Sequence, residues 1–371
     1  MDIAPDDESL AVADLARRLG TEILAPAARA SERAGDVPTK VWETLVGTGL
    51  TLSIPEELGG GGVIGPVARQ VIVENLAYGD SGIAMAAVWS GAASGLLAEH
   101  GSQQQRELVT EVLSDSSRRA GVALYEGFGR SLRDLETTID LHGDVVRVVG
   151  TKVAVPFAGV ADPLVVVGRD VSSGLLRAVV TTGSAAGVTV APVQKGLALD
   201  VARLASVTFD VELPASALLG GPDLDSGLLA WSVQQLRLLV ASAMVGVGRR
   251  ATEYAAAYVS EREAFGRPIA SFQGVSFPLA ESLMRLEAAR LEIADLASSP
   301  SRLSTELLDR AVTDAVDYAS TAAVEATRHG IQSLGGHGYV EDHPVELWHR
   351  CTSFLAALDV DPTSTPFHAA L

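Results

Sequence analysis

The sequence predicts an α+β protein that is mostly helical, with one β-rich segment between two helical blocks. From about Glu8 to Arg119, apolar residues recur at helical spacing. From about Ala120, short β-branched runs follow, separated by Gly or Asp turns, and helical spacing resumes near Leu228. The apolar period thus changes twice, and it divides the chain into three predicted domains, residues 1–119, 120–227 and 228–371.

The composition is typical of a soluble globular protein. The chain has 371 residues, 47% of them apolar and 20% charged, which is enough for two or three domains around a large core. A net charge of −18 argues against nucleic acid or an anionic membrane as a partner, because either needs a basic face. A polyanionic ligand would therefore need local basic residues.

The sequence favours a cytoplasmic location. The acidic segment Met1–Leu10 lacks an apolar core and does not resemble a signal peptide. No run of 18 apolar residues predicts a membrane span. The single cysteine, Cys351, excludes an intramolecular disulfide and fits a reducing compartment, where we expect it to pack rather than react.

Apolar stripes predict the helices of the first domain, starting near Leu10 and Val41 and covering Val67–Tyr78 and Ile83–His100. The Gly-rich stretch Ile54–Gly62 has no strand before it and no Lys after it, so it does not predict a phosphate loop. Five runs predict the strands of a small antiparallel β-domain: Val122–Leu124, Val145–Val149, Leu164–Val167, Leu176–Thr181 and Val207–Val211.

In the third domain, the segment Glu261–Gln273 separates two predicted long helices. Gly266 and Pro268 break the helix, so we expect Arg262 and Gln273 on either side of a turn. An arginine before a Phe-Gly turn suits a diphosphate, since the guanidinium binds phosphate oxygens and glycine permits close approach. Helix–turn–helix segments with an arginine are also common without a ligand, so local physics leaves both interpretations open.

Two motifs in this region resemble those of the acyl-CoA dehydrogenase family. The first is Arg262-x-x-Phe265-Gly266 with Phe272-Gln273 following it. The second is Gln332-Ser-Leu-Gly335-Gly336-His-Gly338-Tyr339, then Pro344-Val345-Glu346 and Arg350. Family-like segments extend from about Leu10 to Leu358, including a Pro-Glu-Glu-x-Gly-Gly-like turn within Ile54–Gly62.

The resemblance implies a helical N-terminal domain, a middle β-domain and a C-terminal four-helix bundle, with FAD as cofactor and an acyl-CoA thioester as substrate. In family oligomers, both motifs cross a subunit interface and contact the ADP portion of a neighbour's flavin. Six residues would make these contacts here: Arg262, Phe265, Gln273, Gln332, Gly335 and Gly336.

The family's reaction removes a proton from the α-carbon of the acyl-CoA and passes the β-hydride to flavin N5. Counted from Arg350, the position of the catalytic Glu falls on Asp359. Asp is one methylene shorter, and a displacement of about 1 Å costs on the order of a hundredfold in rate. The alternative for Asp359 is an exposed acid near the chain end. A second family position precedes Arg237 and holds Leu236, which cannot be a base.

The segments that resemble the family's own flavin site depart from its pattern. Leu124–Ser131 has Tyr125 in place of Thr and Gly127 in place of Pro. Gly150-Thr151-Lys152 is intact, but Ala154-Val155-Pro156 stands in place of a Trp-Ile-Thr-like triplet. Ala154 removes the stacking ring, and Pro156 has neither a hydroxyl nor an N–H for flavin N5.

The motifs that would contact a neighbour's flavin (in trans) are intact, whereas the segments of the chain's own flavin site (in cis) are altered. This combination favours a partner subunit of a heteromeric acyl-CoA dehydrogenase. Some actinobacterial members that degrade steroid side chains, built as heterotetramers, are of this kind. The chain's end at Leu371, which leaves no room for the usual last helix, agrees with that expectation.

Two alternatives stay open. One is a self-sufficient homo-oligomeric acyl-CoA dehydrogenase with Asp359 as base, and the other is a scaffold or acyl-CoA-binding protein without flavin. No metal is expected, because His337 and His343 have no carboxylate or Cys at ligand spacing.

Overall fold

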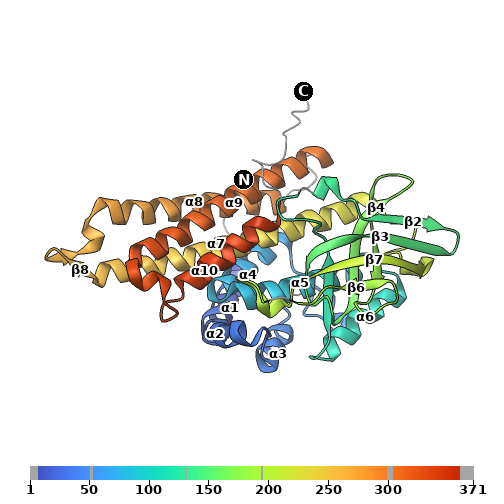
Figure 1. The fold of residues 1–371 in the computed structure, drawn as a ribbon, viewed down its shortest axis with the longest axis horizontal. Helices are drawn as coiled ribbons and strands as arrows, with labels where there is room; N and C mark the ends of the chain where they lie inside the picture. The colour runs from blue at the N-terminus through green and yellow to red at the C-terminus, as the bar shows by residue number, and fades with distance from the viewer. Residues whose placement is uncertain (1–6, 51–52, 131, 194, 299–303, 360–371) are drawn as a thin grey trace. The chain divides into compact units, whose positions relative to one another are not determined.

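The computed structural model describes residues 7–50, 53–130, 132–193, 195–298 and 304–359. Its elements follow the predicted helix–sheet–helix order along the chain (Figure 1). The predicted fold class, α+β and mostly helical, is therefore confirmed. Residues 1–6 of the acidic N-terminal segment and Ser131 lie outside the described residues.

The N-terminal elements are helices, and the predicted segments 67–78 and 83–100 lie within two of them. These elements are α1 (Asp7–Leu19), the π-helical turn η1 (Gly20–Leu24), α2 (Ala25–Ala34), α3 (Thr39–Gly47), α4 (Pro66–Gly79), α5 (Ser81–His100) and α6 (Gln103–Ser114). Helix α6 begins with a capping box between Ser102 and Gln105. The Gly-rich stretch forms a single 3-10 turn, Glu56–Leu58, closed by an Ile54–Gly62 bridge.

Among the described residues, seven strands form one sheet in the middle of the chain. They are β1 (Arg119–Ala123), β2 (Thr138–His142), β3 (Val145–Val155), β4 (Ala161–Asp170), β5 (Leu176–Thr181), β6 (Val188–Val190) and β7 (Ala205–Pro214). The spatial order is β1-β4-β2-β3-β7-β6. Strand β5 lies outside this order and pairs with β4. All five predicted runs lie in or overlap strands, whereas β2 and β6 were not predicted.

The prediction of an antiparallel domain is wrong in one respect, because the sheet is mixed. Strand β4 pairs in parallel with β1 and with β2, while the β2–β3, β3–β7, β4–β5 and β6–β7 pairs are antiparallel. Parallel pairing needs a crossover connection. Here β3 supplies it between β2 and β4, since β3 returns the chain before β4 begins.

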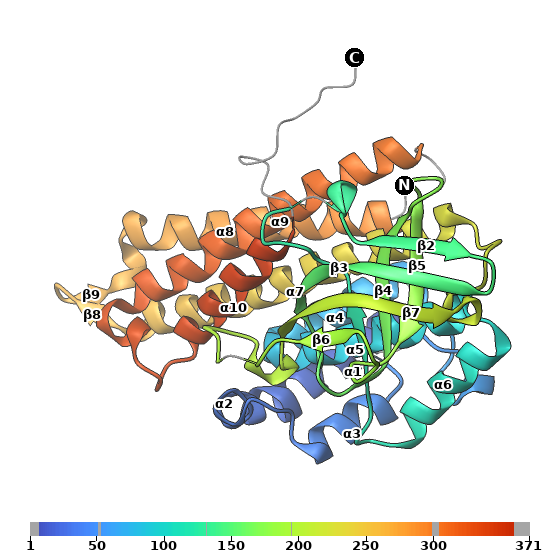
Figure 2. The same cartoon turned by 45° about the vertical axis from the view of Figure 1, so that its right-hand side comes forward.

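Among the described residues of the C-terminal part there are four α-helices: α7 (Ser226–Glu261), α8 (Gln273–Ser298), α9 (Thr305–Leu334) and α10 (Val345–Leu358). A short hairpin, β8 (Glu263–Ala264) and β9 (Arg267–Pro268), and the 3-10 turn η6 (Ile269–Ser271) connect α7 to α8. A second 3-10 turn, η8 (Gly335–Tyr339), follows α9. Helices α8 and α9 pack side by side, as Figures 1 and 2 show.

The chain packs as two compact units that do not follow the three blocks of the sequence. One unit contains the whole of α1, α4, α8 and α9, together with most of α7 and most of α10. The other contains α3, most of α5, α6 and the seven-stranded sheet. Boundaries near residues 119 and 227 thus mark changes of secondary structure, whereas packing groups α1 and α4 with the C-terminal helices.

Helices α5 and α7 are long and apolar enough to cross a membrane, judged by length and composition. Their most apolar windows are 89% and 72% buried inside the fold. Core helices of soluble proteins have the same composition, because they are covered on all sides. Their position in the core accounts for their sequence.

Helix α7 approaches α4 closely at Gly246. A Cβ at this position would lie 2.0 Å from the carbonyl oxygen of Glu74. We therefore predict that Gly246→Ala destabilises the protein by about 3 kcal/mol, because the α4 backbone must move to admit one methyl group. In the control Gly95→Ala, no atom lies within 4 Å of the added Cβ. That change should raise stability by up to about 1 kcal/mol through helix propensity. Urea denaturation measures both, and equal effects would contradict this account.

Candidate functional site

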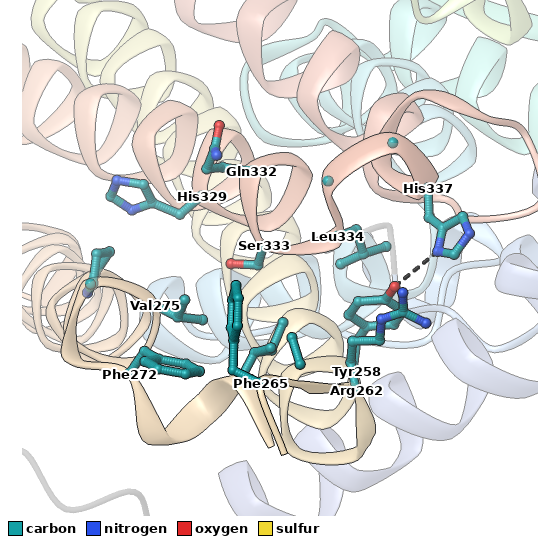
Figure 3. A pocket seen from close by; sticks show the side chains of 16 residues that line it. Tyr258, Arg262, Phe265, Phe272, Val275, His329, Gln332, Ser333, Leu334 and His337 are labelled. Carbon is teal, nitrogen blue, oxygen red and sulfur yellow. Dashed lines mark hydrogen bonds between the residues drawn. The ribbon is translucent and has the colours of Figure 1, made fainter. Parts of the chain in front are cut away.

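A pocket of about 630 Å³ lies where α7 ends, α8 begins and α9 ends (Figure 3). Five of the six residues predicted to contact a nucleotide line it: Arg262, Phe265, Gln332, Gly335 and Gly336. The sixth, Gln273, is the exposed first residue of α8 and does not line the pocket, although Phe272 and Gly274 beside it do. The fold thus brings together Arg262 of the first motif and Gln332 of the second, 70 positions apart in the chain, while the nucleotide assignment itself stays a prediction.

A two-residue hairpin turn forms one wall of the pocket. Phe265 and Gly266 have φ values of 55° and 79°, the two positive values that a type I′ turn requires. A left-handed phenylalanine costs on the order of 1–2 kcal/mol. The Phe265 side chain is also 96% exposed, and it projects from the hairpin into the space lined by the pocket residues (Figure 3). A strained and exposed aromatic residue points to a function beyond folding.

Arg262 is the residue that follows α7, and its backbone is fixed at both ends. Its N–H donates to the Tyr258 carbonyl (2.9 Å), and its carbonyl accepts from the Ile269 N–H (2.8 Å). The side chain is exposed and lines the pocket, and within the described residues no carboxylate forms an ion pair with it. A fixed arginine with an uncommitted guanidinium is well placed to bind an anion.

The opposite wall is the turn between α9 and η8. Gly335 has φ 59° and ψ −131°, a conformation that residues with a Cβ rarely adopt. Nothing lies within 4 Å of the position that a Cβ would take at Gly335 or at Gly336. Both glycines line the pocket, so a ligand has room to contact the backbone there.

The two histidines of the second motif bind tyrosines of α7. The hydroxyl of Tyr258 lies 2.8 Å from His337 Nδ1, and that of Tyr254 lies 2.7 Å from His343 Nδ1. The imidazole rings stack with their centroids 5.5 Å apart. In the part of the chain that the structure describes, no group of three or more His, Cys, Asp or Glu residues could hold a metal ion.

Sequence reasoning missed two polar residues that line the pocket, Tyr258 and His329. Tyr258 precedes Arg262 by four residues, and His329 precedes Gln332 by three. Residues three or four apart share a helix face. This spacing could have found both, because each lies one helical turn from a motif residue.

The described part of the first altered segment, Leu124–Arg130, belongs to the other compact unit, where a buried ion pair holds it. Lys152 is fully buried, and its Nζ donates to the Leu124 carbonyl (3.0 Å) and to Glu126 Oε1 (2.8 Å). The Glu126 carboxylate also accepts hydrogen bonds from the N–H groups of Glu136 and Thr137. The hydrogen-bonding capacity of the Glu126 carboxylate is thus taken up by contacts within the fold.

Burial and pairing shift both groups. Burial lowers the pKa of Lys152 from 10.5 to about 8, although the Glu126 carboxylate opposes this shift. Burial also raises the pKa of Glu126, but the Lys152 ammonium and the hydrogen bonds to the carboxylate outweigh burial and leave that pKa below its ordinary value.

Asp359 is only 5% exposed, so the alternative expectation of an exposed acid is wrong. It follows α10, and two residues earlier the Ala357 carbonyl accepts a hydrogen bond of 2.9 Å from the Gly129 N–H. Tertiary packing therefore brings the end of α10 next to the segment that resembles the flavin edge. A role for Asp359 as base stays a prediction.

Ala154 and Val155 of the altered triplet end β3 in an irregular part of the strand, and Pro156 follows it. The β3–β7 register shifts between Lys152 and Val155, and Ala154 has a φ of 51°. The Val153 N–H donates to the Tyr125 carbonyl (2.8 Å), so the triplet lies next to the other altered segment. Both departures from the family pattern are therefore clustered in one place.

The family model for the acyl-CoA dehydrogenase N-terminal domain matches residues 6–114. The model for the C-terminal domain of the same family matches residues 227–359. Together these matches cover more than half of the 371 residues. The chain belongs to the acyl-CoA dehydrogenase family, which confirms the family that its two motifs resemble.

Among its relatives, acyl-CoA dehydrogenase FadE12 of Mycobacterium tuberculosis is 28% identical over 305 residues, covering 80% of this chain and 77% of the relative. An acyl-CoA dehydrogenase of Bacillus subtilis is 26% identical over 349 residues, covering 91% and 90%.

Two solved structures share the fold. Butyryl-CoA dehydrogenase from Megasphaera elsdenii superposes with a TM-score of 0.81 at 24% identity, covering 97% of this chain and 96% of that one. The structure of PigA with FAD and proline gives a TM-score of 0.84 at 19% identity, with the same coverage. At these identities the likeness shows the fold alone.

Removing one partner of the buried pair should be strongly destabilising. We predict that Lys152→Met lowers the free energy of unfolding at pH 7 by about 3–5 kcal/mol, because the Glu126 carboxylate stays buried without its counterion. The double variant Lys152→Met with Glu126→Gln should recover part of that loss. The control Asp210→Asn breaks the exposed Arg147–Asp210 pair on the same sheet and should change stability by less than about 1 kcal/mol. Similar losses from both single variants would refute the buried role.

The same pair predicts a pH dependence. The folded protein releases the Lys152 proton near pH 8, whereas the unfolded chain keeps it up to about 10.5. The unfolded state therefore binds more protons between these values, and the stability of the wild type relative to Lys152→Met should rise with pH, by up to about 1 kcal/mol per unit. Denaturation of both proteins from pH 7.5 to 9.5 measures the difference, and a falling or flat difference would contradict the sign.

Proposed function

We propose that this chain is a partner subunit of a heteromeric acyl-CoA dehydrogenase and contributes the ADP-side contacts of FAD to a catalytic neighbour. The observation that carries the proposal is an intact, solvent-open pocket with an uncommitted Arg262, in a chain whose own flavin-edge segments are altered. Bound FAD would supply the hydride acceptor for α,β-desaturation of an acyl-CoA thioester in the assembled enzyme.

The lining of the pocket fits the ADP portion of FAD. The Arg262 guanidinium offers a charged donor pair for the diphosphate, and Gly335 and Gly336 leave the backbone open to it. Phe265 and Phe272 offer aromatic faces for a purine, with centroids 6.2 Å apart and rings near perpendicular. The volume lies within the range of small-molecule sites.

An exposed apolar stripe on α8 supports an oligomer. Phe277, Met284 and Leu291 are all exposed and follow one another at intervals of seven residues. Heptad spacing keeps apolar side chains on one face, the arrangement that packs against a partner helix. The stripe begins beside Val275 and Pro278, which line the pocket. A subunit covering this stripe would therefore lie next to the pocket.

The altered segments support a division of labour between unlike subunits. Pro156 has no N–H to offer, Ala154 has no ring, and the Glu126 carboxylate is committed to Lys152. The assembly that the family resemblance favours is a cytoplasmic heterotetramer, with steroid-like acyl-CoA thioesters among its candidate substrates. The mycobacterial relatives are consistent with an actinobacterial setting.

A second candidate is a self-sufficient acyl-CoA dehydrogenase, and the burial of Asp359 close to Gly129 in the segment Leu124–Arg130 favours it. A buried carboxylate next to a cofactor segment could take a proton from the α-carbon. Turnover of an acyl-CoA by the chain alone, abolished by Asp359→Ala, would establish this candidate and exclude the partner role. A scaffold without flavin remains a third candidate, which the next experiment separates.

We predict that Arg262→Ala lowers the FAD content of the complex while leaving the complex assembled. Loss of a charge-assisted contact to the diphosphate should weaken FAD binding by about 1.5–3 kcal/mol, or roughly 10- to 100-fold. The complex is purified through a tag on this chain together with its catalytic partner, and flavin is counted by absorbance. Arg310→Ala is the control, an exposed arginine of α9 that does not line the pocket. Unchanged FAD in the Arg262 variant would favour the scaffold.

We also predict that Met284→Glu disrupts the oligomer, because a carboxylate would be buried in an apolar interface. Light scattering after size-exclusion chromatography should show a smaller species than the wild type. The control Val63→Glu places the same charge at an equally exposed apolar position outside α8 and should leave the mass unchanged. A wild-type mass for both variants would exclude this face of α8 as the interface.

A further inference from the structure

His329 belongs to neither motif, yet it lines the pocket from α9, one helical turn before Gln332 (Figure 3). Its ring is partly exposed, and its Nδ1 lies 3.0 Å from the Ser282 hydroxyl of α8. Because Ser282 is buried and Nδ1 is engaged with it, Nε2 is the ring nitrogen left for a ligand.

The serine fixes the tautomer of His329. Ser282 Oγ donates to the Pro278 carbonyl at 2.8 Å, and a hydroxyl has a single proton to donate. Its contact with His329 is then satisfied only if Nδ1–H donates to Oγ. Burial lowers the pKa of His329, and the nearby Arg328 charge acts in the same direction, so the ring is neutral near pH 7. Nε2 is consequently a bare hydrogen-bond acceptor.

We infer that His329 selects adenine in this pocket, with Nε2 accepting a hydrogen bond from the 6-amino group of the base. This inference rests on the proposed function, because it takes the pocket's ligand to be the ADP portion of FAD. Adenine presents a donor at C6, whereas hypoxanthine and guanine present a carbonyl oxygen there. A carbonyl facing a bare Nε2 would leave two acceptors in contact, so the pocket would reject those bases.

The spacing along α9 fits this assignment. His329 precedes Gly335 by six residues, or about 9 Å along the helix axis. A ribose can lie between a diphosphate at the Gly335–Gly336 turn and a base at His329. Gln332, between them on α9, carries a side-chain amide that can donate and accept toward the base or the ribose. Phe265 and Phe272 face this stretch from the hairpin side (Figure 3).

The test is calorimetric titration of the full chain with ADP and with IDP, which differ at C6 of the base. We expect the wild type to bind ADP about tenfold more tightly than IDP. ADP gains one hydrogen bond to Nε2, whereas the carbonyl oxygen of IDP would be repelled by that nitrogen. His329→Ala should weaken ADP binding and reduce the preference to less than about threefold. His329→Gln, which keeps a side-chain acceptor, should retain part of it. Ser282→Ala should also reduce the preference, since the tautomer is then no longer fixed.

His142→Ala is the control, an exposed histidine of the sheet unit paired with Asp140, and it should leave the preference unchanged. Circular dichroism verifies that each variant is folded. Equal affinities of the wild type for ADP and IDP would overturn the inference, as would a preference that His329→Ala leaves intact. In both cases the proposed function survives, because ADP still binds. If neither nucleotide binds, the inference fails, and the FAD content of the Arg262→Ala complex decides whether the proposed function fails with it.

Discussion

The two-residue turn at Phe265 and Gly266 is the constraint on which the pocket depends. Both residues are left-handed, so the chain reverses at once between α7 and α8. A longer loop would let Arg262 move away from α8, whereas this turn fixes its backbone to Tyr258 on one side and to Ile269 on the other. Packing of α8 on α9 then brings Gln332, Gly335 and Gly336 opposite the hairpin. The strained backbone of Phe265 places its ring at the pocket, in an edge contact with Phe272.

Arg262 and the Lys152–Glu126 pair, which belong to different compact units, use their charges in opposite ways. In the helical unit, Arg262 is exposed at a pocket, and within the described residues it has no carboxylate partner. In the sheet unit, Lys152 and Glu126 neutralise one another and bind backbone groups of the surrounding strands and turns. Charged side chains that are paired within the fold have few hydrogen-bonding positions available for a ligand. A charged side chain that is held in place but unpaired can bind one. This contrast supports the proposal that Arg262 contacts a ligand, whereas the Lys152–Glu126 pair serves the fold.

The sequence predicted whatever depends on local pattern. Apolar periodicity located α4, α5 and five strands, and Gly266 with Pro268 located the end of α7. Strand β2, Thr138–His142, was missed because two of its five residues are Asp140 and His142, and β6 has only three residues. Strand periodicity contains no information about pairing partners, so the parallel neighbours of β4 were not foreseen.

The site was predicted in part for the same reason. The two motifs met in one pocket as the resemblance implied, but Gln273 lies outside its lining. The burial of Asp359 depends on packing between distant segments, which its neighbours in sequence do not reveal. His329 was missed because its importance arises from Ser282 on another helix, 47 residues away.

The most direct test of the central claim is the visible absorption spectrum of the chain purified alone, with flavin counted per chain. A trans donor without a working site of its own should be colourless alone and associated with flavin only in a complex with a second subunit. A yellow protein carrying about one FAD per chain would contradict this account. It would mean that Ala154 and Pro156 are compatible with flavin, and Asp359 would then be the residue to mutate.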